Sequence, residues 1–452
     1  MNNTNNQSPH PAVSEKAKVL GLLIPVAVLC IGFLVGLCFF FRPTESETEK
    51  RELTKFPWPT WETLSSGEYR DDFLSGELTD QISLWYADTF PGREGLIKAY
   101  HGVQSLFGIR SEQFQQGDVG DVVPDGQMPS GPVDELDRPA NGGEGGEKVG
   151  GYYLSGDTAY ELYAYSESGA RTYASLMNRA AAAVAGKAEV YDLIVPLHYS
   201  FALSADVQDS MSLPDAGKFI PYMYSGMNGE VNTVDVYSAL MAHKDEYIYF
   251  RADHHWTATG AYYAYEAYCK KASITPTPLS SYEKLSFGGF LGTLYSKTGQ
   301  PAAMGNNPDT VEAYIPKGTN DEYIYDVNGG DRTRYRGGVV RRDTDSFYAA
   351  ATSKYNCFLM GDHPLIEIHN ENISADRKGT TVLLVKESFG NAFAPFLVDS
   401  YEYVYVVDYR YYKGGTLGQL VTDKGVDDVI FLNNVVAATG NARLSELEDF
   451  IG

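Results

Sequence analysis

Hydrophobic and polar residues in the last third of the chain predict alternating strands and helices. Apolar runs at residues 381–385, 403–408 and 428–432 have the length of strands and lack polar alternation, as in VLLV and YVYVV. Segments of helical composition separate them, at residues 391–397 and 416–424. This order predicts parallel strands that are covered on both faces and joined by right-handed crossovers.

The pattern begins earlier in the chain. We expect helices at residues 168–185 and 257–271, a buried strand at 190–197 and a short strand at 233–237. The sequence therefore predicts an α/β domain with a mostly parallel sheet over residues 151–452.

An uncharged apolar run at residues 19–41 is long enough to span a bilayer. It ends in Cys-Phe-Phe-Phe rather than in small residues, which favours a retained signal anchor over a cleaved signal peptide. Lys16 and Lys18 precede it and favour an N-terminal tail, residues 1–18, on the cytoplasmic side. We expect a single-pass protein of the cell membrane with its C-terminal domain outside the cytoplasm.

Two segments separate this run from the α/β domain. Residues 42–110 have mixed charge and helix-like apolar spacing, which predicts a helical juxtamembrane region. Residues 111–150 are rich in Gly, Asp, Glu and Pro and include NGGEGG at 141–146. Their apolar content is too low to offset the entropy of ordering, which predicts a disordered acidic insertion.

Composition narrows the classes of function. The net charge of −23 argues against nucleic acid as a partner, because phosphates require a basic surface. Cys269 and Cys357 are the two cysteines outside the apolar run, and they form either one disulfide or two buried free thiols.

Candidate chemistry begins at Asp253-His254-His255-Trp256. In an extended segment Asp253 and His255 project to the same side, where the acid can fix the tautomer of the imidazole. A surface loop with incidental histidines is the alternative. Adjacent histidines cannot easily turn both rings toward one ion, and no metal-binding motif accompanies them. We expect neither a metal nor another cofactor.

Ser388 follows the predicted strand at residues 381–385, at the carboxyl edge of the sheet where sites of open α/β folds lie. A serine at a strand-to-helix turn exposes its hydroxyl beside free backbone N–H groups, which can stabilise an oxyanion. A simple helix N-cap is the alternative. The pattern is not G-x-S-x-G, so the α/β-hydrolase elbow is not supported.

Residues 253–256 resemble the signature of the DHHW protein family, which is related to SGNH-hydrolase-like alginate O-acetylation proteins. Further segments resemble the family's motifs, at residues 87–93, 287–295, 386–397 and 408–412. The resemblance implies an SGNH-like, Rossmann-type sheet with flanking helices, in which the serine comes last along the chain.

The same resemblance implies a catalytic triad. In it Asp253 orients His255, His255 is the general base and Ser388 is the nucleophile. His254 occupies a variable position, and Glu387 stands where the family usually has Asp. Candidates for substrate or oxyanion contacts are Asn391, Arg410 and Gly292.

The implied reaction is transfer of an acetyl group to a hydroxyl of a cell-surface polysaccharide, or ester hydrolysis when water is the acceptor. A polytopic membrane acyltransferase is the implied partner. The alternative is a catalytically silent glycan-binding or assembly protein of the cell envelope, which uses some of the 34 tyrosines as a sugar platform.

Overall fold

The computed structural model describes residues 138–335, 338–347 and 351–452, together with shorter stretches at 45–46, 51–52, 55–56, 58–59, 70, 78, 82, 85–86 and 89–90. The chain divides into two units, Met1–Ser111 and Glu112–Gly452. The predicted tail at 1–18 and anchor at 19–41 lie outside the described residues. Within the described parts, no helix has both the length and the apolar character needed to cross a membrane.

The first unit is described at few positions. Its β1 (Glu45–Ser46) pairs antiparallel with β2 (Arg51–Glu52). Helical conformation occurs at Arg70, Leu78, Ile82, Trp85 and Tyr86, within the region predicted to be helical.

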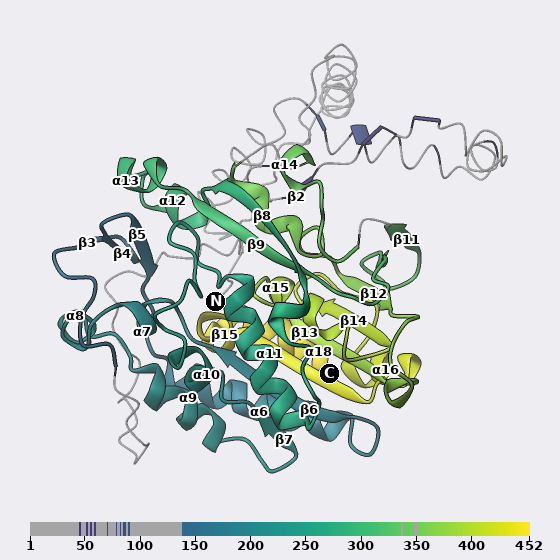
Figure 1. Ribbon diagram of the computed structural model, residues 1–452. Coiled ribbons are helices and arrows are strands. Elements are labelled where there is room, and N and C mark those ends of the chain that lie inside the picture. The colour runs from purple at the N-terminus through teal and green to yellow at the C-terminus, as the bar shows by residue number, and fades with distance from the viewer. Residues whose placement is uncertain are drawn as a thin grey trace, which may run out of the picture. The chain divides into compact units, whose positions relative to one another are not determined.

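The second unit is built on a mixed eight-stranded sheet with the order β11-β10-β12-β14-β13-β15-β6-β7 (Figure 1). Five neighbouring strands are parallel: β14 (Tyr403–Asp408), β13 (Thr381–Lys386), β15 (Asp428–Asn434), β6 (Glu189–Val195) and β7 (Val231–Thr233). Three strands extend one edge antiparallel: β12 (Leu365–His369), β10 (Glu322–Tyr325) and β11 (Arg332–Tyr335).

The central strand β13 explains why the parallel part is stable. All of its residues are buried, and Val385 lies between Val407 of β14 and Phe431 of β15. Unbroken apolar strands of this kind bury both faces of a sheet. The predicted parallel pairing of the last three strands is therefore confirmed, whereas the antiparallel edge was not predicted.

Helices cover both faces of this sheet. Tyr191 of β6 packs on Tyr268 of α11 (Ala258–Ala272), with ring centroids 5.1 Å apart, and α15 (Gly390–Leu397) packs beside α11. The next residue, Asp192, points to the other face and accepts a hydrogen bond from Tyr173 of α6 (2.6 Å). Helices that contact α6 (Glu167–Ala183) or one another on this face include α16 (Leu417–Lys424), α17 (Val435–Thr439) and α18 (Asn441–Ile451).

Smaller elements complete the second unit. Before α11 they are β3 (Glu147–Val149), β4 (Tyr152–Ser155), β5 (Thr158–Glu161), α7 (Tyr199–Ala202), α8 (Ala205–Ser210), α9 (Ala216–Ser225) and α10 (Val236–Met241). After α11 they are η1 (Leu279–Ser281), β8 (Glu283–Phe290), α12 (Thr293–Lys297), α13 (Ala302–Asn306), β9 (Asp309–Ile315), α14 (Thr344–Phe347), η2 (Ala351–Cys357) and η3 (Ala375–Arg377). Cys269 and Cys357 are both buried free thiols.

The prediction of a strand at residues 233–237 is wrong. Strand β7 ends at Thr233, and α10 begins at Val236. The Asp235 carboxylate accepts a hydrogen bond from the backbone N–H of Ser238 (3.0 Å). This side-chain cap starts a helix where apolar composition alone suggested a strand.

Disorder was predicted for residues 111–150, and the structure describes this segment from residue 138 onward. That described part is ordered: β3 pairs with β4, and the Glu144 carboxylate accepts the Gly142 N–H (2.9 Å). The Tyr153 hydroxyl donates to the Gly143 carbonyl (2.6 Å) and accepts the Gly146 N–H (3.1 Å). Hydrogen bonds thus replace the missing apolar contacts, and the prediction is wrong for residues 138–150.

Candidate active site

The histidine segment is a tight loop immediately before α11. Tyr249 and Trp256 form an antiparallel bridge, and the His255 carbonyl accepts the Phe250 N–H (3.2 Å). Thr257 caps α11 by accepting the Gly260 N–H (3.3 Å). The sequence pattern was interpreted as an extended segment. In the structure the segment instead bends back on itself.

Asp253 and His255 face each other for a local reason. The Asp253 Oδ1 accepts the His255 backbone N–H (3.1 Å), which closes a turn through the aspartate side chain. The same oxygen lies 2.6 Å from His255 Nδ1. The expected neighbours are thus brought together by a turn rather than by the pleat of a strand.

The second oxygen of Asp253 is held by another segment. Asp253 Oδ2 accepts the Thr293 N–H (2.7 Å), and a Cβ placed on Gly292 would lie 2.1 Å from the same oxygen. Only glycine fits at position 292. Burial opposes ionisation of Asp253, but His254, His255 and these hydrogen bonds outweigh it and hold the pKa of Asp253 well below its usual range.

Ser388 lies in the turn between β13 and α15, at the carboxyl end of the central strand. Its Oγ is 2.8 Å from His255 Nε2, so a hydrogen-bonded chain runs from Asp253 through His255 to Ser388. The capping position of α15 is Phe389, without a side-chain cap. The alternative in which Ser388 serves as a helix N-cap is therefore wrong.

Glu387 occupies the position where aspartate was expected from the family. Its Oε2 lies 3.2 Å from the Ser388 Oγ and accepts the Phe389 N–H (3.2 Å), while its Oε1 accepts the Asn434 N–H (3.1 Å). Burial raises the pKa of the Glu387 carboxyl. Glu387 thus connects the serine turn to the end of β15.

Trp256 connects the two halves of the site. Its indole Nε1–H donates to the Phe389 carbonyl (2.9 Å), and its side chain is fully buried. The histidine loop and the serine turn are therefore fixed to each other by a bond adjacent to His255 and Ser388.

A buried charged network lies beside Ser388. Lys386 bonds Asp362 (2.7 Å) and Asp408 (2.8 Å), and Arg410 pairs with the same two acids. Asn391 donates its amide N–H to Asp362 (2.9 Å). The structure thus joins Arg410 and Asn391 to Asp362, and it places Gly292 against Asp253. The expected contacts of these three residues with substrate or oxyanion stay predictions.

Tyr355 is a component of the site that the sequence did not indicate. Its ring stacks on His255, with centroids 4.0 Å apart and planes at 10°. It lies on η2, and no motif singles it out among the 34 tyrosines of the chain.

Asp253, His254 and His255 offer one possible metal ligand each, and these ligand atoms lie within 4.8 Å of one another. The two nitrogens of His255 already lie at hydrogen-bond distance from Asp253 and Ser388. An ion bound through His255 would have to displace one of those two bonds, so the geometry fits the hydrogen-bonded chain better than a metal site.

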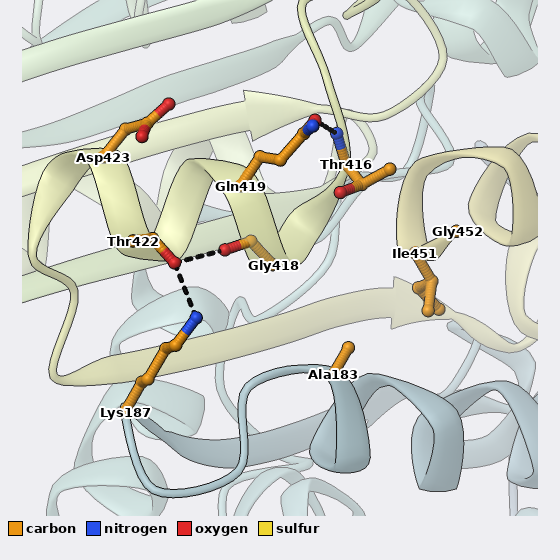
Figure 2. Close-up of a pocket in the computed structure, with 9 residues that line it drawn as sticks. All are labelled: Ala183, Lys187, Thr416, Gly418, Gln419, Thr422, Asp423, Ile451 and Gly452. Carbon is orange, nitrogen blue, oxygen red and sulfur yellow. Dashed lines mark hydrogen bonds between the residues drawn. The ribbon is translucent and has the colours of Figure 1, made fainter.

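A separate cavity of about 550 Å³ lies among α6, α16 and the last residues of the chain (Figure 2). Its polar groups bond one another: Lys187 donates to Thr422 (2.8 Å), and the Thr416 N–H donates to Gln419 (2.9 Å). Neither the hydrogen-bonded chain nor the charged network contributes to its lining. We therefore do not assign this cavity to the site.

Fold and site together define an α/β protein that carries aspartate, histidine and serine at the carboxyl edge of the parallel part of a mixed sheet. The chain belongs to the DHHW protein family, whose sequence model matches residues 49–141 and 138–407. The resemblance inferred from the motifs is thereby confirmed. None of the curated proteins matches the chain.

Two solved structures share the fold, and a third is matched at a lower TM-score. A DHHW family protein from Eubacterium siraeum DSM 15702 is 27% identical, with 68% of this chain and 98% of that chain covered and a TM-score of 0.60. Bacillus cereus PatB1 is 18% identical, with coverage of 64% and 97% and a TM-score of 0.53. The O-acetyltransferase domain of Pseudomonas putida AlgJ is 13% identical, with coverage of 66% and 98% and a TM-score of 0.34.

Proposed function

We propose that this protein is a serine-dependent acyltransferase or esterase that acts on O-acetyl groups of a cell-surface polysaccharide. The observation that carries the proposal is the chain of short contacts from Asp253 to His255 (2.6 Å) and from His255 to Ser388 (2.8 Å). Nucleophile, base and orienting acid in this order are the groups that acyl transfer through a covalent intermediate requires.

In the first half of the reaction, Ser388 Oγ attacks the carbonyl carbon of an acetyl ester while His255 Nε2 takes the serine proton. Asp253 accepts the Nδ1–H of His255 and stabilises the imidazolium. Collapse of the tetrahedral intermediate breaks the bond to the donor oxygen, which receives the proton from His255. The result is acetyl-Ser388 and a free alcohol.

In the second half, an acceptor hydroxyl loses its proton to His255 and attacks acetyl-Ser388. Collapse returns the proton to Ser388 and releases the acetylated acceptor. A glycan hydroxyl as acceptor makes the protein a transferase, and water makes it an esterase. The proposed setting is the outer side of the cell membrane, with residues 19–41 as anchor and a polytopic membrane acyltransferase as source of the acetyl group.

The test is covalent labelling of Ser388 by 4-nitrophenyl acetate, followed by mass spectrometry of the rapidly quenched protein. Wild type should carry one acetyl group on Ser388, and Ser388→Ala should lose both the label and turnover by about 10³-fold or more. Ser400→Ala is the matched control, because Ser400 is also buried and lies just beyond α15. A wild type that is neither labelled nor active on any acetyl ester would contradict the proposal and favour a glycan-binding protein.

A further inference from the structure

Tyr355 contacts both the base and the nucleophile segment of the site. Its ring stacks on His255, and its hydroxyl donates a hydrogen bond to the backbone carbonyl of Ser388 (3.0 Å). Tyr355 thus adds a further connection between these two segments, beside the His255–Ser388 contact and the Trp256 bond to Phe389.

The Tyr355 ring is more nearly parallel to His255 than the other rings that contact it. The planes of Tyr355 and His255 differ by 10°, whereas His254 and Phe389 contact His255 at 37° and 52°. Parallel stacking restricts rotation of the imidazole out of the plane that joins Asp253 and Ser388. The electron-rich face of a tyrosine also favours the positive charge that His255 carries after it has taken the serine proton.

The segment that carries Tyr355 is itself firmly held. Val340 and Phe358 form a bridge, and the Arg341 N–H donates to the Cys357 carbonyl (2.8 Å). The Tyr355 ring meets the edges of Phe250 and Phe358, with centroids at 6.2 and 5.4 Å. A side chain that is only 5% exposed and packed in this way has one available position.

We propose that Tyr355 is a positioning residue that fixes the His255 ring and the Ser388 backbone in the reactive geometry. The inference rests on the proposed function, since it assigns Tyr355 to the same acyl-transfer step. The inference predicts a change in kcat without a change in substrate binding, because Tyr355 is buried and acts only through His255 and Ser388.

The test uses two substitutions that remove the two contacts separately. Tyr355→Phe loses the bond to the Ser388 carbonyl and keeps the stack, so kcat should fall about fivefold to tenfold. Tyr355→Leu loses both, so kcat should fall about 10²-fold, the effect of a misplacement of roughly 1 Å in a reacting group. In both variants KM for 4-nitrophenyl acetate should stay within about twofold of wild type.

Tyr265 provides the matched control. It is fully buried, bonds Ser400 through its hydroxyl (2.7 Å) and stacks on Phe396 (5.7 Å), but it lies in α11 away from the triad. Tyr265→Phe and Tyr265→Leu should lose thermal stability as the Tyr355 variants do, while kcat per folded molecule stays unchanged. Equal losses of kcat at positions 265 and 355 would contradict the inference, because Tyr355 would then contribute only to the stability of the core.

A second readout separates this inference from the proposed function. The proton between His255 Nδ1 and Asp253 gives a downfield NMR signal that reports their contact directly. This signal should be kept in Tyr355→Phe and shifted or broadened in Tyr355→Leu. If wild type acylates Ser388 and Tyr355→Leu does so equally fast, the inference alone is wrong. If wild type is inactive, the proposed function is wrong, and an unchanged NMR signal in Tyr355→Leu would then overturn the inference as well.

Discussion

Asp253 and Asp192 are both buried aspartates of the same α/β unit, yet their surroundings differ. Asp253 receives the His255 N–H and Nδ1–H on one oxygen and the Thr293 N–H on the other. Asp192, under the sheet on the α6 side, receives the Tyr173 hydroxyl on Oδ1 (2.6 Å), and its Oδ2 has no partner among the described residues.

The neighbouring charges and donors together decide the charge of each group. Burial raises the pKa of Asp192 to about 7, because one tyrosine bond offsets only part of the lost hydration. Burial acts on Asp253 in the same direction, but two histidines and two further backbone donors reverse the result and hold its pKa well below the usual range. Asp253 is therefore held in its charged form, whereas burial shifts the titration of Asp192 to about pH 7.

Replacing Asp253 by Asn should have the largest effect. Asparagine has no charge to stabilise the imidazolium, and its amide N–H favours the wrong histidine tautomer, so kcat should fall about 10⁴-fold. Hydrolysis of 4-nitrophenyl acetate measures this loss. Asp192→Asn is the matched control and should keep kcat within about twofold, since it lies outside the hydrogen-bonded chain. Equal losses of kcat in the two variants would show that Asp253 has no catalytic role beyond that of any buried aspartate.

Asp192→Asn should instead change the pH dependence of folding. The pKa of Asp192 is raised in the folded state above its unfolded value of about 3.9, so the folded protein keeps this proton up to a higher pH than the unfolded protein does. The contribution of protonated Asp192 to the free energy of unfolding is therefore complete at low pH. It is lost, by roughly 4 kcal/mol, as pH rises between about 4 and 7. Asparagine resembles the neutral acid and should remove this loss.

Urea unfolding at pH 5 and pH 8 measures the effect. The free energy of unfolding of wild type should fall relative to that of Asp192→Asn between the two pH values. Asp206→Asn, at an exposed position of α8, is the control and should follow wild type. Parallel pH profiles for wild type and Asp192→Asn would show that the buried acid is solvated after all.

The parts of the site that the sequence could predict depend on local order. Asp253 and His255 are two residues apart, so they could be expected to face each other. Ser388 follows a strand whose apolar run is plain, so it could be placed at the carboxyl edge of the sheet. The reason for the Asp253–His255 contact was nevertheless different, because a side-chain turn and not an extended strand joins them. Short spacing restricts two side chains to a few arrangements whatever the backbone does.

The remaining parts depend on contacts between distant segments. Tyr355 and Asp362 reach the site from the region between β11 and β12, and neither carries a motif. Arg410 pairs with Asp362 and Asp408, because charges buried at the ends of β13 and β14 require partners, and its contact with substrate stays a prediction. The antiparallel edge of the sheet was missed for the same reason, since strand direction there is set by long-range pairing.

Gly292→Ala tests how closely the donors around Asp253 must be placed, and its effect should be smaller. The new Cβ would lie 2.1 Å from Asp253 Oδ2 and 2.5 Å from Cγ, so the carboxylate has to move away from the Thr293 N–H. Asp253 keeps its charge and still faces His255 Nδ1, and only the position of its carboxylate changes. We therefore expect kcat to fall about 10²-fold with little change in KM. Gly288→Ala is the control, because the nearest atom to its added Cβ is the Thr310 hydroxyl at 3.9 Å. A tenfold change in rate corresponds to about 1.4 kcal/mol, so a threefold loss is a small effect. Activity within about threefold of wild type in Gly292→Ala would therefore mean that Asp253 needs its charge but not its exact position.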